Sequence, residues 1–401
     1  MADAVFTREE LAGRIERLRE SIRAQNLDGA LILQRADLIY YTGSVFQGAL
    51  AVSAKDGAMI FVWRGRTLIT DEAPAEIRSV RSFGGLHEEL KQVNLTAWKR
   101  IGLELDVLPV SMYLRLMQKL WTTGTALDIS PAIRRQRSVK SEEELARQRR
   151  SEQVLSLGFQ SLKEILREGI YEYEAQALMD VVMRGAGDQS AGRTRGFNAE
   201  ARGVVACGPS AAAPTAFDGP IGQPGRNRLA PMGAGNAAIV AGQPILVDHT
   251  AGVDGYMTDM TRTYAIGRVD SKFVDAHQFC VDLHHEALKR LVPGAVPAEI
   301  YEWSLDEANR AGYAEHFMNR GDNKVRFLGH GIGIEMDEWP VLAGSFEDPL
   351  EENTVLAVEP KIIFEEGGVG VEDTVVVTKK GGIPLTKMEL EIAEAGLRFG
   401  E

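Results

Sequence analysis

ILVDHTAGVDGYMTDMTRT, which spans residues 245–263, is the stretch that most constrains the fold of this chain. Its central dipeptide Asp254-Gly255 is of the kind that closes a two-residue hairpin turn, and apolar residues stand on both sides of it. That turn makes Val253 the partner of Tyr256 at the end of the ladder. The sequence therefore predicts two antiparallel strands whose register is fixed by the turn.

Two aspartates of this hairpin are predicted to share one face. In the expected register Asp248 lies opposite Thr261, and Asp259 lies opposite Thr250. Because side chains alternate faces along a strand, Asp259 and Thr261 point the same way, and Asp248 therefore shares their face. The two aspartates are then diagonal neighbours, about 7–8 Å apart at the backbone, and their carboxylates are able to converge.

A second hairpin is predicted in VEPKIIFEEGGVGVED, residues 358–373. Glu359 and Glu372 are 13 positions apart, and across an even-length loop an odd separation places both side chains on one face. The pair Gly367-Gly368 is expected to supply the positive φ of the turn. Any single carboxylate in such apolar strands is explained by a sheet edge that faces water. Two same-face pairs in a core instead call for cations.

A histidine completes the predicted metal site. His330 lies in FLGHGIGI, residues 327–334, where flanking glycines leave the imidazole unshielded. A histidine in a glycine-rich turn is by itself more often structural, but the four carboxylates make a ligand role the better interpretation. This oxygen-dominated set suits Mn(II), Fe(II), Co(II) or Zn(II) in a dinuclear site that activates a bridging water. The predicted metal ligands are Asp248, Asp259, His330, Glu359 and Glu372.

The chain is predicted to form two domains, an α/β domain over residues 1–136 and a catalytic domain over residues 137–401. Residues 7–25 carry apolar side chains at helical spacing, with Thr7 and Glu10 as a capping box, and helices alternate with strands to about residue 130. Ser141 is expected to cap the long charged helix that opens the second domain. The predicted strands are Gly29–Leu33, Asp56–Val62, Ala237–Val240, Ile245–Val247, Val355–Val358 and Val375–Val377.

Composition argues against several classes of protein. The 401 residues are 44% apolar and 25% charged, as in globular domains, and the formal charge of −12 argues against a nucleic-acid-binding surface. The two cysteines, Cys207 and Cys280, are predicted to be buried and unpaired, which fits a reducing cytoplasm. We find no apolar run of about 18 residues and no basic, apolar leader, so neither a membrane span nor a signal peptide is expected.

The chain resembles the pita-bread metalloenzyme superfamily of aminopeptidase P, prolidase, methionine aminopeptidase and creatinase. The resemblance rests on Asp248 with DMTRT, on GHGIG, VEP and VEDT, and on YYTGS (residues 40–44) and VKSEEEL (residues 139–145). It implies a creatinase-like N-terminal domain, an α+β pita-bread catalytic domain, a homodimer and two divalent metal ions. By this resemblance Asp259 and Glu372 bridge the ions, Asp248 binds one, and His330 and Glu359 bind the other. Glu359 is then also the general base.

Four positions depart from the family pattern. Thr215 stands where prolidases usually carry a histidine, and Asp337 stands where they carry a second one, seven residues after the ligand histidine. Arg326 replaces a further histidine of aminopeptidase P, and Gly370 replaces an arginine. Asp337 is predicted either to transfer a proton, as a second catalytic residue beside Glu359, or to cap a loop. The predicted substrate-binding residues are Thr215, Tyr256 and Arg326.

Three functions are compatible with these residues. The complete ligand set favours an Xaa-Pro dipeptidase-like hydrolase, which cleaves the bond before proline in dipeptides or short peptides. The replaced positions also fit a non-peptidase enzyme, either a C–N hydrolase or a dimethylsulfoniopropionate-type C–S lyase, because function depends on the site rather than the fold. A non-catalytic binding module is the third, and five intact ligands argue against it. Under each hypothesis the partner is a small peptide or a small molecule.

Overall fold

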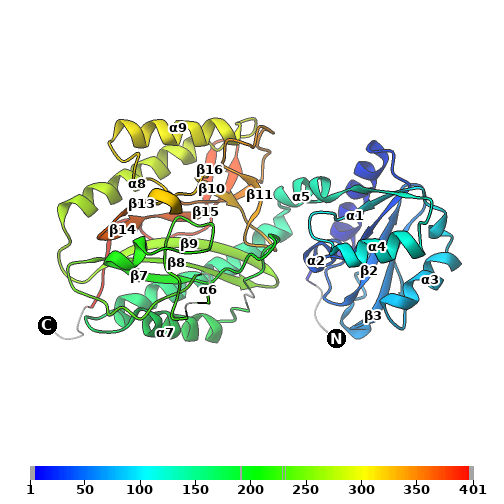
Figure 1. Cartoon of the computed structure of the whole chain (residues 1–401), viewed down its shortest axis with the longest axis horizontal. Coiled ribbons are helices and arrows are strands. Elements are labelled where there is room, and N and C mark those ends of the chain that lie inside the picture. Colours follow the sequence, from blue (N-terminus) through cyan, green and yellow to red (C-terminus); the bar gives the residue numbers. More distant parts are fainter. Residues whose placement is uncertain (1–4, 190–191, 228, 231, 397–401) are drawn as a thin grey trace. The chain divides into compact units, whose positions relative to one another are not determined.

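The computed structural model describes residues 5–189, 192–227, 229–230 and 232–396. Two compact units make up the chain, one ending at Arg137 and the other beginning at Ser138, and each has its own sheet (Figure 1). The predicted domain boundary falls one residue before this division.

Six strands form a mixed sheet in the described part of the N-terminal unit, in the order β4-β3-β2-β1-β5-β6. The pairs β1–β2 and β2–β3 are antiparallel, and the others are parallel. Thr7 caps the first helix by accepting a hydrogen bond from the N–H of Glu10, which is one half of the predicted capping box, while the Glu10 side chain pairs with Arg14. The elements are α1 Arg8–Ala24, β1 Gly29–Ile32, α2 Arg35–Thr42, β2 Gln47–Ser53, β3 Ala58–Arg64, η1 Arg66–Leu68, β4 Glu76–Ser79, η2 Phe83–Gly85, α3 Leu86–Gln92, η3 Leu95–Ala97, β5 Arg100–Leu103, α4 Val110–Lys119, β6 Thr125–Asp128 and α5 Ser130–Ser138.

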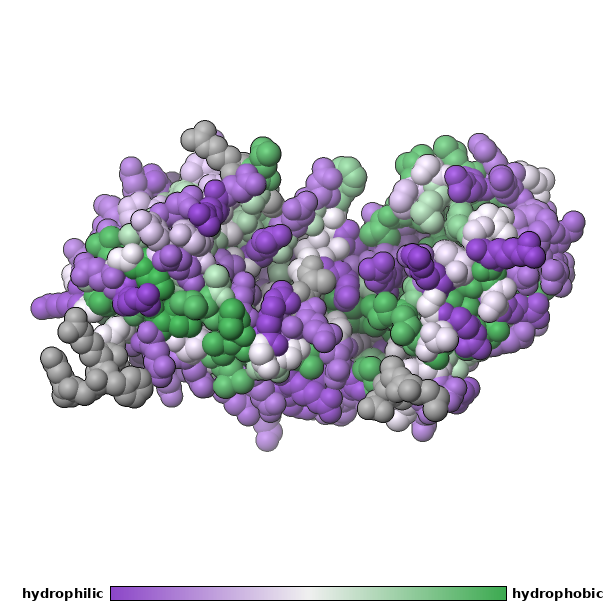
Figure 2. Space-filling view, turned by 90° about the horizontal axis from the view of Figure 1, so that it is seen from below, coloured by the Kyte–Doolittle hydropathy of each residue, from purple (hydrophilic) through white to green (hydrophobic). Residues whose placement is uncertain are grey.

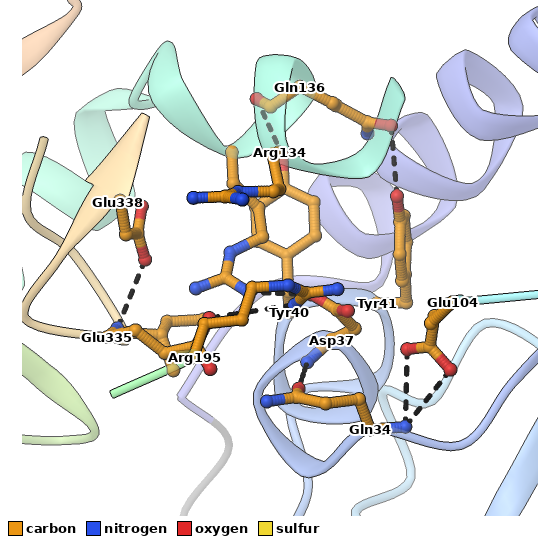
Figure 3. A network of polar contacts seen from close by, with 12 residues as sticks. Gln34, Asp37, Tyr40, Tyr41, Glu104, Arg134, Gln136, Arg195, Glu335 and Glu338 are labelled. Carbon is orange, nitrogen blue, oxygen red and sulfur yellow. Dashed lines mark hydrogen bonds and ion pairs between the residues drawn. The ribbon is translucent and has the colours of Figure 1, made fainter. Parts of the chain in front are cut away.

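A buried carboxylate fixes the segment that joins β1 to α2. Glu104 accepts hydrogen bonds from the backbone N–H of Leu33 at 2.7 Å and of Gln34 at 3.2 Å. Nearby, the Tyr41 hydroxyl donates to the side-chain oxygen of Gln136 at 3.1 Å (Figure 3). Because Glu104 is only 1% exposed, these charge-assisted bonds offset the cost of removing its carboxylate from water. This unit holds none of the predicted site residues.

A nine-stranded sheet lies at the centre of the described C-terminal unit. Its main path is β11-β10-β12-β15-β9-β8-β7, with β16 beside β15 and β17 beside β9, while β13 and β14 form a separate ribbon. Ser141 and Glu144 form the capping box of α6. The elements are α6 Glu142–Ile165, α7 Glu172–Gly185, β7 Val204–Cys207, η4 Gly208–Ala212, β8 Pro244–Val253, β9 Tyr256–Ala265, α8 Ser271–Arg290, α9 Pro297–Arg310, η5 Gly321–Asn323, β10 Gly329–Gly331, β11 Glu338–Val341, β12 Val355–Val358, β13 Lys361–Phe364, β14 Gly367–Gly370, β15 Glu372–Thr378, β16 Gly381–Pro384 and β17 Ala393–Glu394.

Helices lie on two sides of this sheet (Figure 1). α6 and α7 pack against β7, β8 and β9 through a core that includes Phe159, Met179 and Val247. α8 packs against β13, β14 and β16 through a second core, to which Phe273 and Val369 belong. The opposite face of β8 and β9 is turned away from α6, and this is the face on which the predicted aspartates lie.

The first hairpin forms in the predicted register. Asp248 pairs with Thr261, and Asp259 pairs with Thr250. Both turn residues, Asp254 and the glycine after it, have positive φ, 51° and 84° respectively. This is the conformation that a two-residue turn of the predicted type requires, so the turn chemistry sets the register.

The second hairpin forms, but the prediction for its turn is wrong. Glu365 and Glu366 are the turn residues, while the predicted turn pair lies within β14, where Gly368 pairs with Ile363. A Cβ built on Gly368 would lie 2.6 Å from the side chain of Ile363 and 3.0 Å from that of Ala211. The glycine is therefore required for close packing and not for positive φ.

The predicted strand Ala237–Val240 is also wrong. Within it the structure assigns a single isolated bridge, between Ala238 and Tyr171. Its backbone instead bonds to the segment before α7, because the Ile239 N–H donates to the Ile170 carbonyl at 2.8 Å. The apolar side chains that suggested a strand reflect burial of Ile239 in the core beneath the sheet.

The two cysteines are buried and free, as predicted. Burial raises the pKa of the Cys207 thiol to about 11. Because the thiolate is the reactive form, this shift leaves the thiol protonated and inert near neutral pH. Cys207 and Cys280 are therefore packing residues.

The surface mixes polar residues with apolar patches (Figure 2). α6 and α7 contribute the exposed apolar side chains Leu157, Leu178 and Val181. Over the ranges that the structure describes, no helix is both long enough and apolar enough to cross a membrane. The homodimer expected from the sequence stays a prediction.

Candidate metal centre

The five predicted ligands meet in one cluster. β8 carries Asp248, β9 carries Asp259, β10 carries His330, β15 begins with Glu372, and Glu359 directly follows β12. Ligand atoms of Asp259, His330 and Glu372 lie within 4.8 Å of one another, and so do those of Asp248, Glu359 and Glu372. Four of the five are buried, and Asp248 is partly exposed. Two ligand triads that share Glu372 are therefore present.

Strand register brings these residues together. On β9, Thr261 pairs with Asp248 of β8 on one side and with Glu372 of β15 on the other. Asp259 lies two residues away on the same face of β9, because side chains alternate along a strand. Three carboxylates from three adjacent strands thus converge around Thr261. The hydroxyl of Thr261 donates to Oε2 of Glu372 at 2.7 Å, which orients that carboxylate.

A buried arginine holds the strands beneath the cluster. Arg262, 1% exposed, donates to the backbone carbonyl of Glu372 at 2.6 Å and to Oδ1 of Asp373 at 2.7 Å. It also donates to the carbonyls of Thr261, Met388 and Glu389. These bonds satisfy its planar guanidinium and fix the backbone from which Glu372 projects.

His330 is oriented as a metal ligand requires. Its Nδ1 lies 3.0 Å from the Gly331 carbonyl and 3.1 Å from the Met336 carbonyl, so Nδ1 carries a hydrogen and donates. Its Nε2 lies 3.6 Å from Oε1 of Glu359. Burial alone would lower the pKa of His330, but the charges of Asp337 and Glu359 outweigh it and raise the pKa to about 9. A backbone bond at one ring nitrogen is how proteins usually fix the ligating tautomer.

Burial and crowding raise the pKa values of the carboxylates. Burial, followed by the charges of Glu372 and Asp248, raises the pKa of Asp259 well above its ordinary value. Burial raises the pKa of Glu359 to about 8, although Lys361 opposes the shift. A divalent cation would reverse both shifts because it favours the ionised carboxylate. Hard oxygen donors around one imidazole therefore fit a divalent metal ion, whose identity this donor set leaves open.

Lys361 is a member of the cluster that the sequence prediction missed. Its Nζ lies 2.5 Å from Oε2 of Glu359, 2.9 Å from Oε2 of Glu372 and 3.2 Å from Oδ2 of Asp248. Burial alone would lower the pKa of the ammonium, but Asp248, Glu359 and Glu372 raise it well above its ordinary value. The sequence indication is a lysine at the start of the apolar strand β13, directly after the Glu-Pro motif.

A pocket opens over the cluster. Besides four carboxylates and His330, its lining includes Asp337, whose Oδ1 lies 3.5 Å from Nδ1 of His330, and the apolar Phe217 and Phe327. His249 also lines it, with Nε2 3.0 Å from Oδ1 of Asp180, and the sequence prediction missed it although it directly follows Asp248. Asp337 thus stands at the pocket wall beside His330, and whether it transfers a proton or caps a loop stays a prediction.

Three residues predicted to bind substrate do not line this pocket. Thr215 lies two residues before Phe217 and accepts a hydrogen bond from its N–H at 3.2 Å. Arg326 is exposed to solvent. The Tyr256 ring is fully buried, and its hydroxyl donates to Oε1 of Glu144 at 2.8 Å. In this arrangement Tyr256 joins α6 to the sheet, and its role as a substrate contact stays a prediction.

Replacing Tyr256 with phenylalanine separates these two roles. We expect Tyr256→Phe to destabilise the protein by about 1.5–3 kcal/mol, because buried Glu144 loses a charged hydrogen bond. KM and kcat should change by less than about twofold, as for a residue that binds no substrate. Urea denaturation and steady-state kinetics on the same preparation measure both effects. A KM raised severalfold with unchanged stability would instead assign Tyr256 to substrate.

The sequence pattern of metallopeptidase family M24 matches residues 146–379, and that of the creatinase/prolidase N-terminal domain matches residues 14–139. The Xaa-Pro dipeptidase of Pyrococcus furiosus is 24% identical over 94% of this chain and 99% of its own length. Among solved structures, an Xaa-Pro dipeptidase from Bacillus anthracis has TM-score 0.81 at 24% identity, over 96% of this chain and 99% of that one. An X-Pro aminopeptidase from Thermotoga maritima has TM-score 0.78 at 24% identity, over 95% and 99%.

Proposed function

The chain belongs to metallopeptidase family M24, whose pattern covers more than half of it, and on that basis we propose that it hydrolyses the bond before proline in dipeptides or short peptides. The observation that carries the proposal is the buried cluster of four carboxylates and His330 beneath an open pocket. Burying such a cluster without a metal ion would cost much free energy, because its carboxylates would lose their hydration. The names of the Xaa-Pro dipeptidases that the chain resembles over nearly its whole length supply the substrate class.

We assign metal binding, proton transfer and substrate binding to different residues of the site. Asp259, His330 and Glu372 would hold a divalent ion, which when bound supplies a Lewis acid and lowers the pKa of water. Glu359 is the general base, because it lines the pocket and its Oε1 lies 3.6 Å from Nε2 of His330, where a carboxylate is placed to take up a proton. Asp337 lies beside His330 at the pocket wall, where it would pass a proton to the leaving nitrogen. Phe217 and Phe327 give the pocket apolar walls suited to a proline ring.

Release of proline tests this function. The Mn(II)-loaded protein is incubated with a panel of Xaa-Pro dipeptides and with matched Xaa-Ala dipeptides, and free amino acids are quantified. We expect release from the Xaa-Pro peptides and little from the Xaa-Ala series. Absence of release from every peptide, with metal verified in the protein, would refute the proposal.

A non-peptidase function on the same site is the second candidate. It is favoured by Asp337, an acidic group at the pocket wall in a position where the resemblance leads one to expect histidine. A carboxylate there suits a cationic substrate and is able to abstract a proton. Assays with small cyclic amides and with dimethylsulfoniopropionate would detect C–N hydrolysis or C–S cleavage. Turnover of one of these substrates without proline release would favour this candidate.

Asp337→Asn tests the proton-transfer role under either function. We expect kcat to fall about 10²-fold, at the lower end of what general acid–base catalysis contributes, and the pH profile to change shape. Asp218→Asn is the matched control, because Asp218 lines the same pocket but is exposed. Rates within about twofold of the parent for both variants would show that Asp337 only caps a loop.

A further inference from the structure

We propose that the ammonium of Lys361 takes the place of one of the two metal ions expected from the sequence, so that the site binds a single divalent ion. The ion is held by Asp259, His330 and Glu372, and Lys361 neutralises the second triad. This inference rests on the metal-binding part of the proposed function. It does not depend on which substrate the enzyme uses.

The ammonium sits among one complete set of candidate ligands. Asp248, Glu359 and Glu372 form one of the two triads, and Nζ of Lys361 lies 3.2, 2.5 and 2.9 Å from their respective oxygens. Its side chain is fully buried, so the cation belongs to the interior of the site. Three donor hydrogens meet three acceptor carboxylates, which satisfies the ammonium completely. A buried lysine without such partners would lose its charge.

The pairing of β13 with β14 positions the Lys361 side chain in the site. Lys361 begins β13 and pairs directly with Gly370 of β14. A Cβ at position 370 would lie 2.6 Å from Cγ of Lys361 and 3.0 Å from its Cα. Lys361 therefore passes through space that any side chain at position 370 would occupy. The same Cβ would lie 2.8 Å from the Pro360 carbonyl oxygen, so a side chain at position 370 would meet both the Lys361 side chain and the backbone before it.

The charge and position of Lys361 affect metal binding by the two triads differently. A second divalent ion bound by Asp248, Glu359 and Glu372 would lie against the ammonium, and like charges so close repel strongly in a buried site. In the other triad, which consists of Asp259, His330 and Glu372, the member that contacts Lys361 is Glu372. Lys361 and Thr261 both donate to Oε2 of Glu372, so a metal ion held with Asp259 and His330 is expected to take Oε1. One ion is therefore compatible with the lysine, and two are not.

Metal counting on the full-length protein tests the inference without any assay of activity. The protein is reconstituted with excess Mn(II), desalted, and analysed by elemental analysis and by electron paramagnetic resonance. We expect one Mn(II) per chain with an uncoupled spectrum for the parent. Lys361→Ala should bind two ions per chain and show an exchange-coupled spectrum. Two ions in the parent, or no ion in the parent, would overturn the proposal, and so would one ion in the folded Lys361→Ala protein.

A second substitution keeps the test decisive if Lys361→Ala fails to fold. Lys361→Met retains a long side chain beside Gly370 and removes only the charge. We expect it to bind its first Mn(II) at least about tenfold more tightly than the parent, in competition with a chelator, because a repelling charge is gone. Lys272→Met is the matched control, since Lys272 is 40% exposed and its ion pair is with surface Glu366. Equal affinities of Lys361→Met and the parent would overturn the proposal.

The two proposals fail in different ways. A parent protein with one Mn(II) per chain that releases no proline would refute the proposed substrate and leave the role of Lys361 standing. A parent protein with two coupled ions that releases proline would do the reverse. Metal content is measured without peptide, so neither result depends on the other.

Discussion

Replacing Asp259 with asparagine is expected to abolish hydrolysis and to weaken metal binding by more than roughly 100-fold, which is the upper end of the loss caused by altering a residue outside the coordination shell. Asp259 is 5% exposed and lies in the triad with His330 and Glu372. Burial and neighbouring charges raise its pKa well above the ordinary value, and a bound cation would favour its ionised carboxylate. Asparagine preserves shape but offers a neutral amide oxygen, which makes the expected loss electrostatic.

The same hairpin provides a control for this substitution. Asp254 lies in the turn with φ 51°, a conformation that asparagine also adopts readily. Its carboxylate pairs with Arg150 at the surface, where an ion pair contributes little. Asp254→Asn should therefore keep full activity and metal content. Isothermal titration with Mn(II) and the proline-release assay follow both variants. Activity retained by Asp259→Asn would contradict the metal centre under either enzyme hypothesis.

The first hairpin shows how far local sequence determines this site. A two-residue turn at Asp254-Gly255 fixes the register, and the register alone places Asp248 and Asp259 on one face. No tertiary information was needed, because side-chain period and turn type are local properties. The convergence of Glu359 and Glu372 was predicted from their odd separation for the same reason. It holds although the turn falls at different residues, since only the even length of the loop matters.

Contacts between segments that are far apart in sequence could not be predicted from turn type and side-chain period. Lys361 looks like the polar end of an apolar strand, and its burial depends on Gly370 across the hairpin and on the carboxylates of Asp248, Glu359 and Glu372. Tyr256 was predicted to bind substrate, which stays untested, and nothing in the sequence indicates that its hydroxyl bonds to Glu144 of α6, more than a hundred residues away. Helix docking and cross-strand packing decide both positions. Neither leaves a periodic pattern in the sequence.

Removing the buried guanidinium of Arg262 is expected to cost about 3–5 kcal/mol of stability, the usual loss when one partner of a buried ion pair is deleted. Arg262→Met leaves Asp373 without its partner at 2.7 Å and removes a donor from four backbone carbonyls. The loss should concentrate in β9 and β15, the strands that Arg262 ties together. Since β15 carries Glu372, metal affinity should fall as well, although Arg262 touches no ligand oxygen.

Hydrogen exchange and urea denaturation measure this effect, and Arg150→Met provides the matched comparison. Arg150 is 63% exposed, and its pair with Asp254 lies at the surface, so its removal should cost less than about 1 kcal/mol. Faster exchange confined to β9 and β15 in Arg262→Met, with weaker Mn(II) binding, would show that the arginine positions Glu372 through the backbone. Equal stability of the two variants would mean that the carbonyls find other donors. Arg262 would then be dispensable for the architecture of the metal centre.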